Sequence, residues 1–113
     1  MFRATTPKQV FIFDLNPAMF ARILITYAQG DEIILEKNEN DLTVEEEIDN
    51  GGSITGYKAW FRMTQEEANM FKARSTKKVY VQVRALTFSG EALASRIEQV
   101  NVHDVLNEEV LTL

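Results

Sequence analysis

The sequence of 113 residues contains no cysteine and a single histidine, His103. The absence of cysteine excludes disulfide bonds, thiolate zinc sites and a cysteine nucleophile, and it fits a reducing compartment. One histidine excludes metal sites with several imidazoles and leaves only His103 for a Ser-His-acid triad. This residue follows the last predicted strand, and no serine stands in a nucleophile-elbow context. The sequence also lacks an EF-hand spacing and a glycine-rich phosphate loop, so we expect no catalytic residues, no metal site and no cofactor.

Basic residues are also few, since 12 Lys and Arg stand against 17 Asp and Glu, which gives a formal net charge of −5. Nucleic-acid affinity depends largely on clustered Lys and Arg, so we expect no nucleic-acid partner. No apolar run approaches the ~20 residues that span a membrane, and residues 1–7 lack the apolar core of a signal peptide. We expect a single soluble domain, residues 1–113, made in the cytoplasm and without a membrane partner.

Two-residue alternation of apolar side chains is the clearest pattern that is present. It extends over Val79–Leu86 and Ala92–Val102, which Phe88-Ser89-Gly90 joins. Alternation with this period is typical of strands with one buried face. A three-residue loop pairs Ala85 with Leu93 and places Gly90 in a left-handed conformation. The apolar positions change parity after Ile97, which predicts a β-bulge at Glu98-Gln99.

A second hairpin is predicted to follow the same turn chemistry. Strands Ala21–Tyr27 and Asp31–Lys37 are joined by Ala28-Gln29-Gly30, again with glycine last. The predicted register pairs Ile25 with Ile33 and Ile23 with Leu35. The side chains expected to be buried are those of Ile23, Ile25, Tyr27, Ile33 and Leu35.

The remaining segments complete a fold of about seven strands. Further strands are predicted at Gln9–Leu15, Leu42–Ile48 and Ile54–Arg62, and Thr64-Gln65-Glu66-Glu67 is a capping box that begins a helix over Gln65–Ala73. Tight loops join neighbours in one sheet, whereas longer segments cross between sheets. This predicts an all-β, immunoglobulin-like β-sandwich with one short helix between the fifth and sixth strands and strands one, four and five in one sheet. A small barrel is the alternative.

The outward faces suggest where another protein could bind. Outer positions of the four-stranded sheet mix apolar, aromatic and arginine groups, as interfaces do, although scattered surface apolar residues are also normal. Trp60 either anchors a partner or lies under a loop. Residues 1–8 form an N-terminal arm, and the tail at residues 104–113 is too apolar for a free disordered end, so we expect it to dock on its own domain or on another subunit. The predicted interface residues are Leu24, Ile34, Trp60, Tyr80, Arg84, Leu86, Val110 and Leu111.

Two charged clusters have simpler interpretations. Glu45-Glu46-Glu47 and Asp49 could gather a cation, but alternate strand residues point to opposite faces, so a solvated edge strand is favoured. Lys72, Arg74, Lys77 and Lys78 could contact an acidic patch of a partner. We favour a solvated helix end and loop, because no aromatic residues alternate with these charges.

Five segments together carry a resemblance that covers most of the chain, from about Val10 to Leu111. They are ITYAQGD at Ile25–Asp31, MTQEE at Met63–Glu67, VQVRAL at Val81–Leu86, GEALAS at Gly90–Ser95 and DVLNEEVL at Asp104–Leu111. This pattern resembles small proteins encoded in the structural-gene modules of phages and prophages of Gram-positive bacteria. The resemblance implies a virion or assembly component of the tail, neck or head surface.

The expected function is therefore non-enzymatic. We expect a phage structural protein that assembles with other phage structural proteins or with itself and is located in the virion after synthesis in the bacterial cytoplasm. The alternative is a module that binds carbohydrate or a host surface through its loops, for which only Phe88 is well placed. A hydrolase would require His103 beside a serine or a carboxylate in a pocket.

Overall fold

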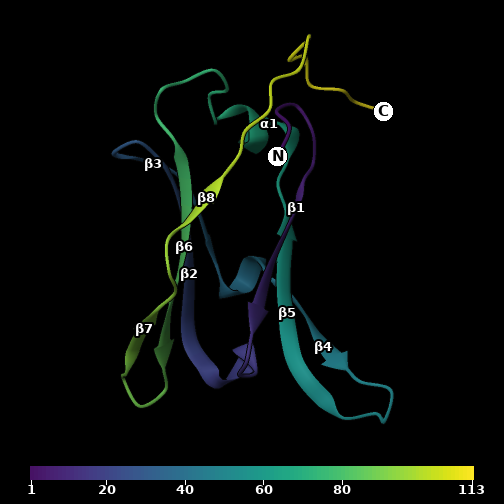
Figure 1. The fold of residues 1–113 in the computed structure, drawn as a ribbon, viewed down its shortest axis with the longest axis vertical. Coiled ribbons are helices and arrows are strands. Elements are labelled where there is room, and N and C mark those ends of the chain that lie inside the picture. Colours follow the sequence, from purple (N-terminus) through teal and green to yellow (C-terminus); the bar gives the residue numbers. More distant parts are fainter.

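The computed structural model describes every residue from Met1 to Leu113, and it places eight strands in two antiparallel sheets (Figure 1). One sheet has the order β1-β5-β4, and the other has the order β3-β2-β6-β7, with β8 also paired to β6. The strands are β1 (Lys8–Phe13), β2 (Phe20–Gln29), β3 (Glu32–Asn38), β4 (Thr43–Ile48), β5 (Ile54–Arg62), β6 (Val79–Thr87), β7 (Ala92–Ala94) and β8 (Glu98–Val100). Helix α1 (Gln65–Asn69) follows β5, and two 3₁₀ turns lie at Pro17–Met19 and Glu39–Asp41. The all-β sandwich, its single helix and the assignment of strands to sheets are confirmed.

The core is centred on β2. Ile23, Ile25 and Tyr27 are buried on one face of this strand, as the alternation predicted. The Tyr27 ring makes edge contacts with Phe61 of β5 and with Phe71 after α1, and its hydroxyl donates a hydrogen bond to Gln9 Oε1 at 2.9 Å. Burial raises the pKa of Tyr27 well above its ordinary value. The tyrosine thus joins both sheets and the helix segment through one side chain.

The register predicted for the β2–β3 hairpin is wrong. Strand β2 continues to Gln29, which lies opposite Glu32, so that the turn is Gly30-Asp31 and not the three residues Ala28-Gln29-Gly30. A bulge then shifts the register between Tyr27 and Ala28. Ile33, predicted to be buried, is therefore 58% exposed, whereas Leu35 is buried as predicted. Gly30 does take the left-handed conformation, with φ +62°.

The predicted parity change in the last hairpin is present, but it lies earlier in the sequence. Ala85 lies opposite Leu93 as predicted, and Gly90 has φ +90°. Val81 lies opposite Glu98 rather than Ile97, so the extra residue falls between Ala94 and Glu98 and divides the predicted strand into β7 and β8. Ser95 bridges the gap, because its N–H donates to Val83 O at 2.8 Å and its Oγ accepts from Val83 N at 3.0 Å.

Helix α1 has the predicted capping box but ends early. Glu67 N donates to Thr64 Oγ1 at 3.1 Å, and Thr64 N donates to Glu67 Oε1 at 3.0 Å. The predicted helix reached Ala73, whereas the observed helix ends at Asn69. The same Glu67 carboxylate forms an ion pair with Lys37 Nζ of β3 at 2.6 Å, with both side chains largely buried. A cap on one element thereby connects the helix to the edge of the opposite sheet.

Replacing Glu67 with glutamine is expected to lower the free energy of unfolding by about 1–2 kcal/mol at neutral pH, because Lys37 loses its partner while the cap is retained. Burial alone would raise the pKa of the Glu67 carboxyl, but the hydrogen bonds from Lys37 and Thr64 and the Lys37 charge hold the pKa below its ordinary value of 4.5. A lowered folded-state pKa stabilises the fold above that value, and this stabilisation is lost as pH falls through the folded-state pKa. Urea denaturation at neutral pH and at about pH 2 should therefore show the difference vanishing in acid.

The matched control is Glu66→Gln, an exposed neighbour in the same turn that makes no ion pair. Its effect on the free energy of unfolding should stay within about 0.5 kcal/mol. A Glu67→Gln effect of the same size at both pH values would show that the carboxylate acts through packing and not through its charge.

Candidate interaction site: an apolar cleft between the sheets

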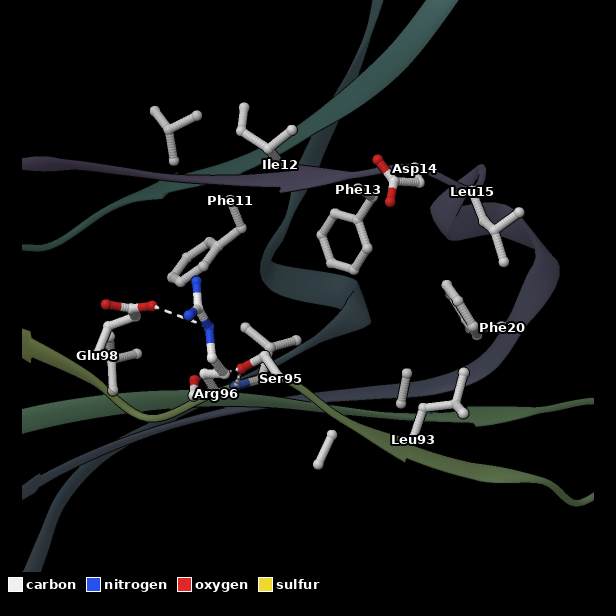
Figure 2. A pocket seen from close by; sticks show the side chains of 15 residues that line it. Phe11, Ile12, Phe13, Asp14, Leu15, Phe20, Leu93, Ser95, Arg96 and Glu98 are labelled. Carbon is white, nitrogen blue, oxygen red and sulfur yellow. Dashed lines mark hydrogen bonds and ion pairs between the residues drawn. The ribbon is translucent and has the colours of Figure 1, made fainter.

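An open apolar cleft lies between β1 of one sheet and β6, β7 and the Ser95–Glu98 segment of the other. Its volume is about 740 Å³, and 11 of its 15 lining residues are hydrophobic. Figure 2 shows Phe11 and Phe13 pointing from β1 toward the opposite wall, with Phe20 and Leu15 at one end and Leu93 on the far side. The cleft is therefore a continuation of the core that remains open to solvent.

The cleft stays open because no strand covers this side of the sandwich. β1 pairs only with β5, and β7 pairs only with β6, so each presents a free edge. A free edge leaves unpaired backbone N–H and C=O groups that can pair with an additional strand. The cleft thus combines apolar side-chain pockets with two unpaired strand edges.

The exposed area of the whole chain is large for its size. A compact monomer of 12.9 kDa exposes about 6,300 Å², whereas this chain exposes 7702 Å². The extra area of about 1,400 Å² exceeds the ~800 Å² that each partner contributes to an interface of standard size. The chain therefore has enough unburied surface for a stable protein contact.

The charged residues that line the cleft are exposed and form its rim, and Ser95 is the fourth polar residue of the lining. Arg96 and Glu98 form an ion pair at 4.0 Å with both side chains mostly exposed, and such a pair stabilises little. Asp14 is the other charged residue of the lining. The rim can therefore orient a bound segment without a large desolvation cost.

Most residues predicted to lie on the outer face of the five-stranded sheet do lie there. Leu24 lies opposite Arg84, and Tyr80 and Leu86 are each 38% exposed. The prediction that Ile34 lies on this outer face is wrong, because this residue is half-buried and packs against the core cluster. Because of the bulge in the β2–β3 pairing, Ile33 lies opposite Ala28 and takes the outward position. Four of the predicted interface residues therefore share this face, and Ile34 does not.

Trp60 lies on the other sheet, apart from those four residues. Lys8 Nζ lies 4.1 Å from the centroid of its ring, and its Nε1 donates to Glu45 Oε1 at 3.2 Å. These contacts come from the strands on either side of β5. Trp60 is thus half-covered by charged side chains and not by a loop.

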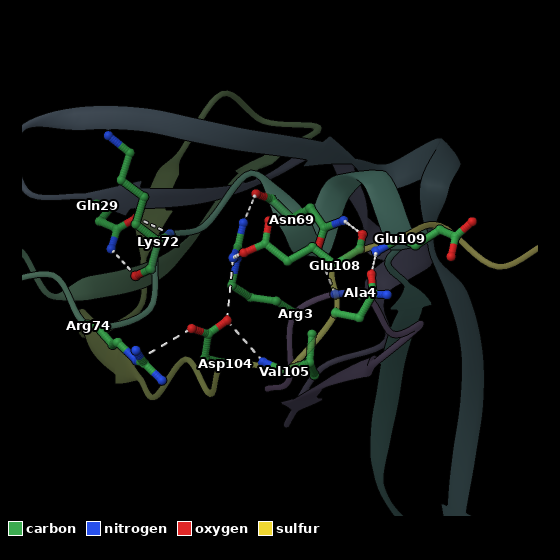
Figure 3. Close-up of polar contacts among 11 residues, drawn as sticks. Arg3, Ala4, Gln29, Asn69, Lys72, Arg74, Asp104, Val105, Glu108 and Glu109 are labelled. Atoms are coloured by element: carbon green, nitrogen blue, oxygen red, sulfur yellow. Dashed lines mark hydrogen bonds and ion pairs between the residues drawn. The ribbon is translucent and has the colours of Figure 1, made fainter.

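The tail is held on its own domain by polar contacts, as Figure 3 shows for its first half. The largely buried Arg3 guanidinium contacts Asp104 at 3.5 Å, forms an ion pair with Glu108 and donates to Asn69 O at 3.0 Å. Farther along, Leu111 N donates to Gln65 Oε1 and Leu111 O accepts from Gln65 Nε2, each at 2.7 Å. Docking on the domain is therefore observed, but the bonds use the tail's backbone and charges and leave Leu111 71% exposed. Val110 is half-buried.

The four basic residues line a smaller polar cleft of about 250 Å³ together with His103. The loop that carries them is fixed by Gln29, and Arg74 forms an ion pair with Asp104 at 3.5 Å. The His103 ring lies against Phe2, with centroids 4.9 Å apart. Neither the basic loop nor His103 meets the apolar cleft.

The acidic strand β4 is an edge strand, as predicted. Its Glu47 carboxylate lies 2.9 Å from Lys58 Nζ, and this hydrogen bond raises the pKa of Lys58. No three Asp, Glu or His side chains are close enough together to hold a metal ion. None of the helices has the length and apolar character needed to cross a membrane.

The cleft was not predicted, although β1 carried a signal for it. Val10, Phe11, Ile12 and Phe13 are apolar on both faces of the strand, a pattern typical of a strand covered on both sides. In the structure Val10 and Ile12 are exposed, and Phe11 and Phe13 are only half-buried.

No known family model matches the sequence, and no curated protein shows significant similarity to it.

Proposed function

We propose that this chain is a non-enzymatic structural or assembly component of a phage virion, belonging to the tail, neck or head surface and acting through protein–protein contacts. The observation that supports the contact role best is the open apolar cleft between the free edges of β1 and β7. The phage context and the location in the virion are supported by the resemblance of the five segments described above. The proposed partners are other phage structural proteins or a second copy of the chain.

The cleft favours an extended partner segment over a small molecule. A segment added to a free edge gains backbone hydrogen bonds, and alternate side chains enter pockets between the sheets. The half-buried rings of Phe11 and Phe13 offer such pockets on one wall, and Leu93 offers one on the other. Filling the cleft would complete the core of the sandwich, which supplies the driving force.

The outer face of the five-stranded sheet is proposed as a second contact. Tyr80, Arg84 and Leu86 include residue types that are enriched in interfaces, and all three lie on one face of β6. Packed particles bring several surfaces of each subunit into contact. We therefore assign the cleft to a bound segment and this face to a neighbouring subunit.

Carbohydrate binding through the loops receives less support. Such a role needs aromatic rings gathered at one end of the sandwich. Phe88 is 76% exposed at the β6–β7 turn, but Trp60 lies on the face of the other sheet between Lys8 and Glu45. The arrangement therefore favours contact with proteins.

The test is binding of the purified chain to the proteins of the phage particle, with mass spectrometry of purified particles to detect the chain itself. Leu93→Glu should reduce this binding at least about tenfold, because a carboxylate left unpaired in an apolar contact costs more than the ~1.4 kcal/mol that a factor of ten represents. Leu93 is 41% exposed in the free chain, so the substitution leaves the monomer folded.

The control is Ile48→Glu, the same change at an exposed apolar residue outside the cleft, and it should bind like the unsubstituted chain. Equal binding by both variants would contradict the role of the cleft. If the chain is absent from particles and binds none of their proteins, the structural role itself is wrong.

A further inference from the structure

The geometry points to the tail of a second copy of this chain, residues 104–113, as the segment that occupies the cleft. This inference rests on the proposed contact role and names its partner. Two unpartnered apolar features exist on the same chain, the cleft and the tail. Their association between copies would bury both.

The tail has the side chains that such a segment requires. Leu106, Leu111 and Leu113 are exposed, although each would be stabilised by burial. Leu111 and Leu113 are two residues apart, so on a strand they point to the same side. In the cleft, that side would meet Phe11, Phe13 and Leu93.

The length also fits. The β1 wall of the cleft spans Val10–Leu15, six residues, which is about 20 Å in a strand. Ten tail residues reach about 33 Å when extended. The tail can therefore cover the wall of a neighbouring copy and still begin at its own Asp104.

The contacts of the tail with its own domain favour exchange between copies over closure within one chain. Gln65 binds the backbone of Leu111 at the start of α1, and Arg3 binds the Asp104 and Glu108 carboxylates. Figure 1 shows the tail leaving the molecule beside α1, at the end opposite the β6–β7 turn. Held in this way, the tail lies at the far end of the molecule from β7, which forms one wall of its own cleft.

The charges permit the association. Two copies that each carry −5 repel one another, but the tail brings Glu109 toward a rim on which Arg96 is 94% exposed at its side chain. Glu109 makes no ion pair within its own chain. The opposite charges at the rim therefore offset part of the repulsion.

Cross-linking tests the inference directly, because the chain has no cysteine of its own. Leu111→Cys and Leu93→Cys proteins are mixed and treated with a flexible bismaleimide whose reach tolerates a two-residue shift in register. We expect a cross-linked heterodimer at a yield at least about tenfold above that of Leu111→Cys mixed with Ile48→Cys. Equal yields would overturn the inference.

Light scattering provides the second measurement. The mass of the unsubstituted chain should rise above 12.9 kDa with concentration, and the double variant Leu111→Ser, Leu113→Ser should remain at 12.9 kDa. Both side chains are exposed in the single chain, so the double variant is expected to fold. Phe88→Ser, the loss of an exposed apolar residue elsewhere, should associate like the unsubstituted chain.

The outcomes separate this inference from the proposed function. A chain that stays monomeric but binds particle proteins through Leu93 overturns self-association and leaves the cleft as a contact site. A double variant Leu93→Cys, Leu111→Cys that cross-links within a monomer also overturns it, because the tail then closes its own cleft. A chain that neither associates nor binds particle proteins overturns both.

Discussion

Replacing Phe71 with alanine is expected to lower the free energy of unfolding by about 4 kcal/mol. The ring is fully buried and makes an edge contact with Tyr27, with centroids 5.8 Å apart. Phe71 follows α1, which comes after β5, whereas Tyr27 belongs to the other sheet. Removing the ring therefore creates a cavity where the helix segment meets both sheets.

The effect is large relative to the total stability. The core cluster holds eight buried residues, and a domain of this length is stable by only about 6–17 kcal/mol. Because the core is small and one side of the sandwich is open, we expect stability toward the lower end of that range. Urea denaturation followed by circular dichroism measures the change.

The matched control is Phe88→Ala, the same change in a ring that is exposed at the β6–β7 turn. It should alter the free energy of unfolding by less than about 0.5 kcal/mol. A Phe71→Ala effect below about 1 kcal/mol would show that the segment after α1 does not contribute to the core.

Strand periodicity was predictive where one face of a strand packs against the opposite sheet, as in β2. Alternation in β2 identified Ile23, Ile25 and Tyr27 as buried, and the capping box identified the start of α1. Both signals are local, because each depends on the backbone geometry of a few successive residues. This is why the strands, the helix start and the division into two sheets could be predicted.

The errors occur where distant contacts decide between two locally acceptable structures. A left-handed Gly30 suits either a two-residue or a three-residue turn. The choice is made by Gln29, whose amide bonds to the loop before β6 and keeps this residue within β2. The end of α1 is similar, because Asn69 binds Arg3 and Ala4 from the N-terminal arm. No local pattern contains these partners.

The cleft could not be predicted for a related reason. Alternation predicts the face of the strand on which a side chain lies, but it does not predict whether another element covers that face. Phe11 and Phe13 point between the sheets, yet no further strand of the chain covers them. Likewise, an apolar tail predicts docking but not the polar contacts with Arg3 and Gln65 that hold it.

The second large effect is expected for Gln29→Met, which should lower the free energy of unfolding by about 2–3 kcal/mol. Gln29 is the one buried polar residue of the core, and its side chain satisfies three backbone groups. Its Oε1 accepts from Lys72 N at 2.8 Å, and its Nε2 donates to Lys72 O at 2.7 Å and to Lys77 O at 3.1 Å. Methionine retains the length of the side chain but leaves those three groups without partners.

The same substitution should loosen the loop that carries the basic residues more than it loosens the core. The substitution should accelerate hydrogen exchange more at the Lys72 amide than at the Ile25 amide, because only the Lys72 N–H loses its acceptor. The control is Gln82→Met, in which the amide makes one exposed bond, to Ser95 O at 3.0 Å, and the expected loss is below about 1 kcal/mol. Equal losses for the two variants would mean that water replaces the Gln29 amide at no cost. Faster exchange confined to Lys72 would instead show that this buried amide is what fixes the loop before β6.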